Sequence, residues 1–286
     1  ATAGDFHLKT TDTVLRNTGT NLSADAGYAF AVDIDGAGRV DGSWDRGADE
    51  APRKVYYSVG TSTANLNSAS TVTITSGAAQ FNAAQTNNNI GVGDKLIAGG
   101  NTYYISGRSD QQNYTVITAT GATPANLGST AVTSITRAFN ALGTAVNATE
   151  GSSAASASFL NTSNLVSGNY QLNIPCYADG VDSTGFSVNG WMTGAGNYIK
   201  VYTPVASTEA GTSQRHNGTP SSGYQVGGGY IRDEYVRFDG ISIQDDSGSA
   251  LYIFDVDGKG EVHVSNCLSR ISPTTEWAQS IYVNNS

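Results

Sequence analysis

The second half of the chain consists of short runs of strand-forming residues separated by turn residues. From about residue 164 the runs are five to eight residues long, and several begin roughly 10 to 15 residues apart. In YVRFDGISI from Tyr235 and EVHVSNCL from Glu261, apolar and polar residues alternate as in a strand with one buried face. Short strands with polar turns and no helices between them indicate a β-sandwich or a β-solenoid.

Three features favour the solenoid. Asn and Gly recur just after the strands, where the chain must turn a corner with positive φ. The length between strands varies irregularly, as it does when loops project from a coil. The third feature is a predicted helix over 133–147, which precedes these strands and would cover the open end of a coil.

Two predicted elements lie before the repetitive region. The helix carries one apolar stripe at spacing i, i+4, i+7 and i+11, which we interpret as packing surface; its members are Ile135, Phe139, Leu142 and Val146. Residues 51–131 hold short β runs between turn residues and predict a small antiparallel sheet or barrel. Gly99, Gly100 and Asn101 stand between two of these runs, which is typical of a hairpin.

Composition and charge exclude several classes of function. The net charge of −9 and the pI near 4.6 argue against a nucleic-acid partner, because phosphates require a basic face. No stretch approaches about 18 consecutive apolar residues, so no membrane span is predicted. The chain begins at Ala1 without Met or a signal peptide, which fits a mature secreted protein at the cell surface or outside the cell.

Two parts of the sequence resemble the secreted right-handed parallel β-helix proteins, the broad pectate-lyase-like class. The stretches GNYIKVYTPVASTEAGTSQRHNG, EYVRFDGISI and EVHVSNCLSR are similar to the early coils of those proteins. The opening stretches, DFHLKTTDTVLRNTG and DIDGAGRVDGSWDRGADE, resemble a segment that closes many such proteins before a surface anchor. The resemblance implies a mainly β fold: a right-handed parallel β-helix preceded by a small antiparallel β module and one capping helix.

The predicted organisation has four parts. Residues 1–50 form a capping or donor segment, and 51–131 form the small antiparallel β module. Residues 132–163 contain the helix and a linker, and 164–286 form the parallel β-helix.

In this arrangement the closing motif precedes the coil that it would close, while SIYVNNS ends the chain on a strand. A bare strand edge is a template for pairing, and terminal repeats need caps. We therefore expect the donor segment of one molecule to cover the last coils, about 250–286, of the next molecule, which makes a head-to-tail homopolymer such as a surface filament or sheath. The predicted contact residues are apolar: Phe6, Leu8, Tyr28, Phe30, Trp44, Ile281 and Val283.

Two alternatives to this assembly stay open. The chain is then either a piece of a longer repetitive protein, or a molecule whose first 50 residues cap its own coil. A separate alternative is a carbohydrate-binding or polysaccharide-degrading module with a glycan partner. The carboxylates and the cation considered for that chemistry are Asp233, Glu234, Arg237, Asp245, Asp246, Asp255 and Asp257. Because carboxylate pairs are common in turns, we expect no enzymatic activity from them.

Calcium is the one cofactor that the sequence suggests. DIDGAG at 33–38 and DVDGKG at 255–260 resemble the start of a calcium-binding D-x-D-x-D-G loop. Both lack the acidic fifth position and the Glu at position twelve, so a looser site is the calcium hypothesis. Its candidate ligands are Asp33, Asp35, Asp41, Asp45, Asp255 and Asp257.

The remaining metal and redox residues are sparse. Cys176 and Cys267 lie 91 residues apart, and the sequence leaves a disulfide and two free thiols equally open. His7, His216 and His263 are scattered, so no catalytic triad can be argued from their spacing.

Overall fold

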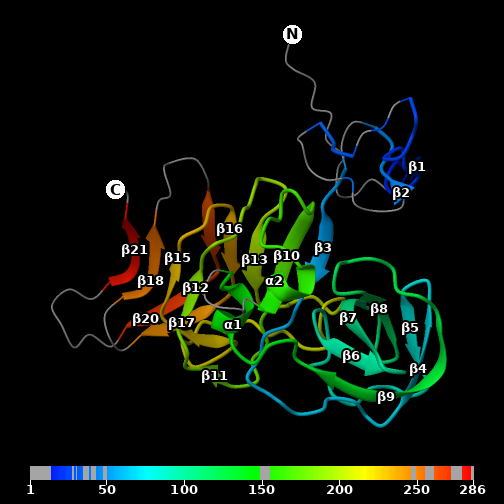
Figure 1. Ribbon diagram of the computed structural model, residues 1–286. Helices are drawn as coiled ribbons and strands as arrows, with labels where there is room; N and C mark the ends of the chain where they lie inside the picture. The colour runs from blue at the N-terminus through cyan, green and yellow to red at the C-terminus, as the bar shows by residue number, and fades with distance from the viewer. Residues whose placement is uncertain are drawn as a thin grey trace.

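The computed structural model describes residues 14–27, 29, 31–34, 39, 43–47, 50–148, 155–245, 249–254, 261–271 and 279–284. Across these residues the chain is mainly β (Figure 1). The predicted right-handed parallel β-helix with one capping helix is wrong as a description of the fold. The strands form a closed six-stranded antiparallel barrel, three separate parallel sheets and a small N-terminal unit.

The barrel occupies the middle of the chain. Its strands follow the order β4-β5-β8-β7-β6-β9, and each is antiparallel to its neighbours. The long strand β9 closes the barrel because it pairs with both β4 and β6. The strands are β4 (Thr71–Thr75), β5 (Ala78–Phe81), β6 (Lys95–Ala98), β7 (Asn101–Arg108), β8 (Asn113–Ile117) and β9 (Leu127–Thr136).

The local sequence predicts the hairpin between β6 and β7. Ala98 pairs with Asn101, so Gly99 and Gly100 alone connect β6 to β7. Their φ angles are 59° and 75°, and a two-residue hairpin turn with both central residues at positive φ strongly favours glycine. The predicted hairpin is confirmed.

The predicted helix over 133–147 is wrong. Residues up to Thr136 belong to β9, and only α1 (Leu142–Val146) is helical. Ile135 pairs with Leu96 and enters the barrel core, so long-range strand pairing overrides the helical spacing of the apolar residues. That spacing did locate buried residues, because all four members of the stripe are buried: Ile135, Phe139, Leu142 and Val146.

The three parallel sheets lie beside the barrel. The first sheet has the order β19-β16-β13-β10-β3, the second β11-β14-β17-β20 and the third β12-β15-β18-β21. From β10 onward, consecutive strands fall in the first, second and third sheet in turn, so their inward side chains share one apolar core. The strands of the first sheet are β3 (Arg53–Tyr56), β10 (Tyr170–Pro175), β13 (Ile199–Tyr202), β16 (Val236–Asp239) and β19 (Val262–Ser265).

The other two sheets have four strands each. The second contains β11 (Val181–Asp182), β14 (Gln225–Gly227), β17 (Ser242–Asp245) and β20 (Leu268–Ile271). The third contains β12 (Phe186–Val188), β15 (Gly229–Ile231), β18 (Ser249–Phe254) and β21 (Gln279–Asn284). The remaining elements are α2 (Ala155–Leu160) and the antiparallel pair of the N-terminal unit, β1 (Gly19–Thr20) and β2 (Ser43–Trp44).

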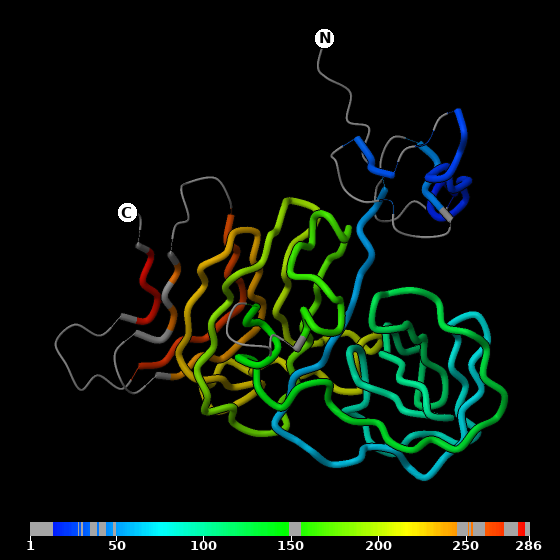
Figure 2. Tube along the Cα trace, in the orientation of Figure 1, coloured from blue at the N-terminus to red at the C-terminus, as the bar shows by residue number. Residues whose placement is uncertain are grey.

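The barrel is an insertion within the first sheet. Strand β3 precedes the barrel in the sequence, yet it pairs in parallel with β10, which follows the barrel. The barrel strands span 71–136, so the predicted module boundaries at 51 and 131 are displaced on both sides. Figure 2 shows the chain leaving the N-terminal unit, passing through β3 and then entering the barrel.

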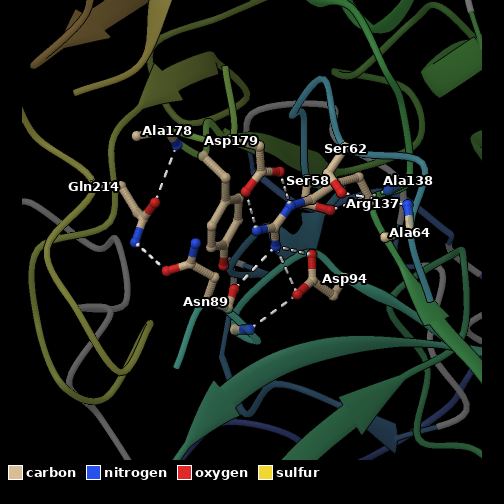
Figure 3. Close-up of polar contacts among 12 residues, drawn as sticks. Ser58, Ser62, Ala64, Asn89, Asp94, Arg137, Ala138, Ala178, Asp179 and Gln214 are labelled. Atoms are coloured by element: carbon tan, nitrogen blue, oxygen red, sulfur yellow. Dashed lines mark hydrogen bonds and ion pairs between the residues drawn. The ribbon is translucent and has the colours of Figure 1, made fainter. Parts of the chain in front are cut away.

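A buried arginine joins the barrel to the parallel sheets, and we call this contact the Arg137 junction (Figure 3). Arg137 follows β9 directly and donates through Nη1 to Oδ1 of Asp94 at 2.8 Å. Its Nε donates to Oδ2 of Asp179, which follows β10, at 2.7 Å. The guanidinium also lies 3.6 Å from the centre of the Tyr177 ring. Burial raises the pKa of Asp94, while Arg137, the Gly91 N–H and Ser58 act in the opposite direction.

Replacing the arginine tests this junction. Arg137→Met leaves Asp94 and Asp179 buried without their cation, so we expect the free energy of unfolding to fall by about 3–5 kcal/mol. Urea denaturation measures the change. The control is Arg232→Met, because Arg232 is exposed and should cost less than about 0.5 kcal/mol. Equal losses in the two variants would contradict a structural role for the junction.

Buried tyrosines predict a loss of stability in alkali. Burial, followed by Glu209 and Tyr198, raises the pKa of Tyr56 to about 12, and burial raises the pKa of Tyr104 to about 12. In an unfolded chain the pKa of tyrosine is about 10. The contribution of these two tyrosines to the free energy of unfolding is therefore complete below about pH 10 and is lost as the pH rises toward about 12. Urea denaturation at several pH values, with phenolate absorbance followed in parallel, should show unfolding and ionisation together; a flat stability curve over this range would contradict it.

Candidate functional site

The opening motif DIDGAGRVDGSWDRGADE builds a compact unit around a buried tryptophan. Trp44 is 2% exposed, and the guanidinium of Arg39 lies 5.3 Å from the centre of its ring. Arg39 donates through Nη1 to Oε2 of Glu50 at 3.2 Å, and Glu50 accepts from the N–H of Asp45 at 2.9 Å. All four residues come from the motif, so the motif encodes its own small core.

Two of the predicted calcium ligands accept backbone hydrogen bonds in this unit. Asp45 accepts from the N–H groups of Asn17 at 2.6 Å and Ala51 at 2.9 Å. Asp33 accepts from the N–H of Glu50 at 3.3 Å. Among the residues that the structure describes, no group of three or more His, Cys, Asp or Glu side chains is placed to hold a metal ion. The other predicted ligands lie outside the described residues: Asp35, Asp41, Asp255 and Asp257.

The parallel sheets have an end that we call the open edge, formed by β19, β20 and β21. Each of these strands stands last in the order of its sheet, so within the described chain it pairs on one side only. The backbone N–H and C=O groups on the other side of an edge strand are available to another strand. Figure 1 places β20 and β21 at the opposite side of the molecule from the barrel.

Burial decreases sharply toward the open edge. Leu251 of β18 is completely buried, whereas Ile281, its in-register partner on β21, is 46% exposed. Val283 lies two residues further along β21 and is 62% exposed. The apolar column between the sheets therefore reaches the surface at β21.

The opposite end of the same sheets is covered. In the first sheet, β3 pairs with β10, and in the third sheet α1 packs against β12. Two hydrogen bonds fix this cover: Leu142 N–H donates to Asp182 at 2.8 Å, and Trp191 Nε1 donates to the carbonyl of Val146 at 2.7 Å. The parallel sheets thus have one covered end and one open edge.

The N-terminal unit does not cover the open edge of its own molecule. In Figure 1 β1 and β2 lie on the opposite side of the view from β21. The arrangement in which the described part of the first 50 residues caps the same chain is therefore not the one observed. The unit instead presents three apolar side chains that are each more than half exposed: Val14, Val32 and Ile34.

The structure exposes some of the predicted contact residues and buries another. Ile281 and Val283 are exposed, as a contact surface requires. Trp44 is buried inside the N-terminal unit and cannot serve as a surface anchor. Phe6, Leu8, Tyr28 and Phe30 lie outside the described residues. The sequence analysis missed the exposed apolar residues of the unit, although Val32 and Ile34 belong to the alternating run YAFAVDI that signalled a strand.

The described members of the set considered for catalysis, Asp233, Glu234 and Arg237, do not form one site. Asp233 accepts from the N–H groups of Gly190 and Trp191, both at 3.0 Å, which is a structural role. Arg237 faces outward on β16, and its guanidinium lies 3.6 Å from the centre of the Tyr198 ring. Asp246, Asp255 and Asp257 and the side chain of Asp245 lie outside the described structure. The described contact of Glu234 is through its backbone carbonyl, which accepts from the Thr193 hydroxyl at 2.8 Å.

The described cysteines and histidines also form no common centre. Cys176 is buried and Cys267 is half-buried, and both are free thiols. His216 Nε2 lies 2.6 Å from the carbonyl of Asn266, and His263 pairs with Glu261 at 2.9 Å. His7 lies outside the described residues.

Comparisons with known proteins provide no relative for this chain. No family model, no curated protein and no solved structure matches it. In the part of the chain that the structure describes, no helix is both long and apolar enough to cross a membrane.

The tryptophan at the centre of the N-terminal unit can be tested alone. Trp44→Ala removes the ring on which Arg39 rests and should cost about 3–5 kcal/mol, enough to unfold so small a unit. Limited proteolysis should then cut within residues 14–50 while the barrel and the parallel sheets stay resistant. Wild-type resistance of the unit in this variant would contradict the importance of the buried ring.

Proposed function

We propose that the chain is a structural subunit that assembles head to tail. The N-terminal unit of one copy covers the open edge of the next copy, and repetition of this contact extends a filament or sheath. The proposed setting is outside the cell. The contact is heterologous, because two different surfaces of the same chain meet.

The observation that carries this proposal is the asymmetry of the parallel sheets. One end is covered by β3 and α1, whereas the strands of the open edge pair on one side only within the described chain and carry the exposed side chains Ile281 and Val283. An exposed apolar edge strand is a site of association that proteins normally protect. A partner that covers this edge removes the apolar side chains Ile281 and Val283 from water and can add a strand to the sheets.

The N-terminal unit is the proposed partner for two reasons. It carries Val14, Val32 and Ile34 as exposed apolar residues, and it lies away from the open edge of its own molecule. Full burial of one Val or Ile side chain contributes about 1.5–3 kcal/mol. Five such side chains across one contact provide enough apolar surface to favour association, with added hydrogen bonds along the edge strands.

The first test is electron microscopy of negatively stained protein. We expect the full chain to form long regular fibres and a chain lacking residues 1–50 to form none, because the covering unit is absent. Circular dichroism of the shortened chain must show retained β structure. Monodisperse single molecules in both samples would contradict head-to-tail assembly.

The second test changes the open edge by substitution. Ile281→Lys with Val283→Lys places two charges on β21 and should abolish fibres while leaving a folded monomer. The matched control is Met192→Lys with Val205→Lys, because these side chains are exposed to a similar degree elsewhere. Fibres should persist in the control, and equal loss in both pairs would assign the effect to charge rather than to the open edge.

A further inference from the structure

The loop between β13 and β14 contains an Asn-Gly pair, Asn217 with Gly218, and a second such pair, Asn189 with Gly190, follows β12. In an Asn-Gly pair the backbone nitrogen of glycine can attack the side-chain carbon Cγ of asparagine, because glycine has no side chain to hinder the approach. Ammonia then leaves and a succinimide ring forms, which water opens to aspartate or isoaspartate. The groups around the reacting atoms determine how fast these steps run in a folded protein.

A histidine lies beside the nitrogen that must lose its proton. The N–H of Gly218 donates to Nδ1 of His216 at 3.3 Å. Nε2 of the same ring lies 2.6 Å from the carbonyl of Asn266, and because a carbonyl oxygen only accepts, Nε2 carries the ring proton. In the neutral ring Nδ1 therefore holds the lone pair, and it faces the reacting N–H group. This is the position that a general base requires.

Three donors surround the side-chain oxygen of Asn217. The N–H of Thr219 lies 3.2 Å from Oδ1 and can only donate, which fixes the orientation of the amide group. The hydroxyls of Thr219 and Ser222 both lie 2.7 Å from the same oxygen and can each donate to it. Donors around a carbonyl oxygen stabilise the negative charge that develops on it when a nucleophile attacks its carbon. The loop therefore provides an oxyanion hole for this side chain.

Contacts with the parallel sheets hold the loop in this shape. The carbonyl of Pro220 accepts from Nε2 of Gln244 at 2.6 Å and from the hydroxyl of Ser242 at 3.0 Å, and both donors belong to β17. Asn266, which accepts from His216, lies between β19 and β20. Anchoring at two separate places positions the base and the oxyanion donors relative to one another before the reaction begins.

The second Asn-Gly pair has different surroundings. The N–H of Gly190 donates to the carboxylate of Asp233 at 3.0 Å, and the same carboxylate accepts from the N–H of Trp191 at 3.0 Å. The carbonyl of Asn189 accepts from the N–H of Ala148 at 3.0 Å, which fixes the backbone on the other side of the pair. The two pairs share one dipeptide and differ in their contacts, so Asn189 provides an internal reference for Asn217.

We propose that Asn217 is a self-modification site at which His216 promotes the formation of a succinimide. Nδ1 of His216 takes the proton of the Gly218 N–H while that nitrogen bonds to Cγ of Asn217. The three donors hold the negative charge on Oδ1, and the proton then passes from Nδ1 to the amide nitrogen Nδ2, which leaves as ammonia. Water is the co-reactant that opens the ring, and it reaches the site because Asn217 and Gly218 are exposed. This reaction goes beyond the proposed assembly, since it takes place within one molecule.

Peptide mapping by mass spectrometry tests the proposal on the wild-type chain. The folded protein and the same protein unfolded in urea are incubated at mildly alkaline pH, and the asparagine, succinimide, aspartate and isoaspartate forms of each Asn-Gly peptide are followed over time. We expect Asn217 to convert about tenfold faster in the folded protein than in urea, because unfolding removes the base and the oxyanion donors. Asn189 should convert faster in urea, where its backbone is released. Equal or slower conversion of Asn217 in the folded protein would overturn the proposal.

A substitution of the histidine tests its role as the base. His216→Gln removes the imidazole and keeps an N–H group that can donate to the carbonyl of Asn266. The conversion rate of Asn217 in the folded variant should fall about tenfold. An unchanged rate would overturn the proposal. The comparison of folded and unfolded wild-type protein needs no variant, so it still decides the question if this variant does not fold.

Substitutions of the hydroxyl groups test the oxyanion hole. Thr219→Val with Ser222→Ala removes both hydroxyls and should slow conversion of Asn217 severalfold. The matched control is Ser213→Ala, which removes a hydroxyl from the same loop that accepts from the N–H of Arg215. The control should convert at the wild-type rate, and an equal loss in the control would contradict the assignment of the two hydroxyls.

Discussion

A single buried cation, Arg137, connects the two largest parts of the molecule. Asp94 directly precedes barrel strand β6 and Asp179 follows a strand of the first sheet, so the arginine side chain bonds across the boundary between the barrel and that sheet. Because a buried charge without a partner is costly, all three groups must be brought together whenever the fold forms. The barrel is inserted between β3 and β10, and this junction fixes the inserted body against the sheet that it interrupts.

The two ends of the parallel sheets differ. Helix α1 and strand β3 cover one end, and the open edge exposes Ile281 and Val283 at the other. The proposed assembly uses the second end, where the N-terminal unit of the next copy would cover the exposed apolar side chains.

The N-terminal unit shows how a motif rich in Asp and Gly folds around a single buried ring. Beside Trp44, Glu50 accepts hydrogen bonds from the Arg39 guanidinium and from the backbone N–H of Asp45. The guanidinium also lies over the Trp44 ring, so a short polar segment acquires a core. Asp33 and Asp45, the described members of the predicted calcium set, accept backbone hydrogen bonds in the same unit. The predicted anchor Trp44 is internal for the same reason, and Val14, Val32 and Ile34 are the apolar residues left at the surface.

The sequence by itself determined the local features. Alternation located the strands, Gly99 and Gly100 set a hairpin, and the spacing of Ile135 to Val146 identified buried residues. Tertiary structure decided that Ile135 lies in a strand, because pairing with Leu96 across the barrel outweighs local helical spacing. It also decided the closed barrel and the Arg137 junction. Such contacts depend on register between distant strands, and a shift of one residue would turn every side chain to the other face.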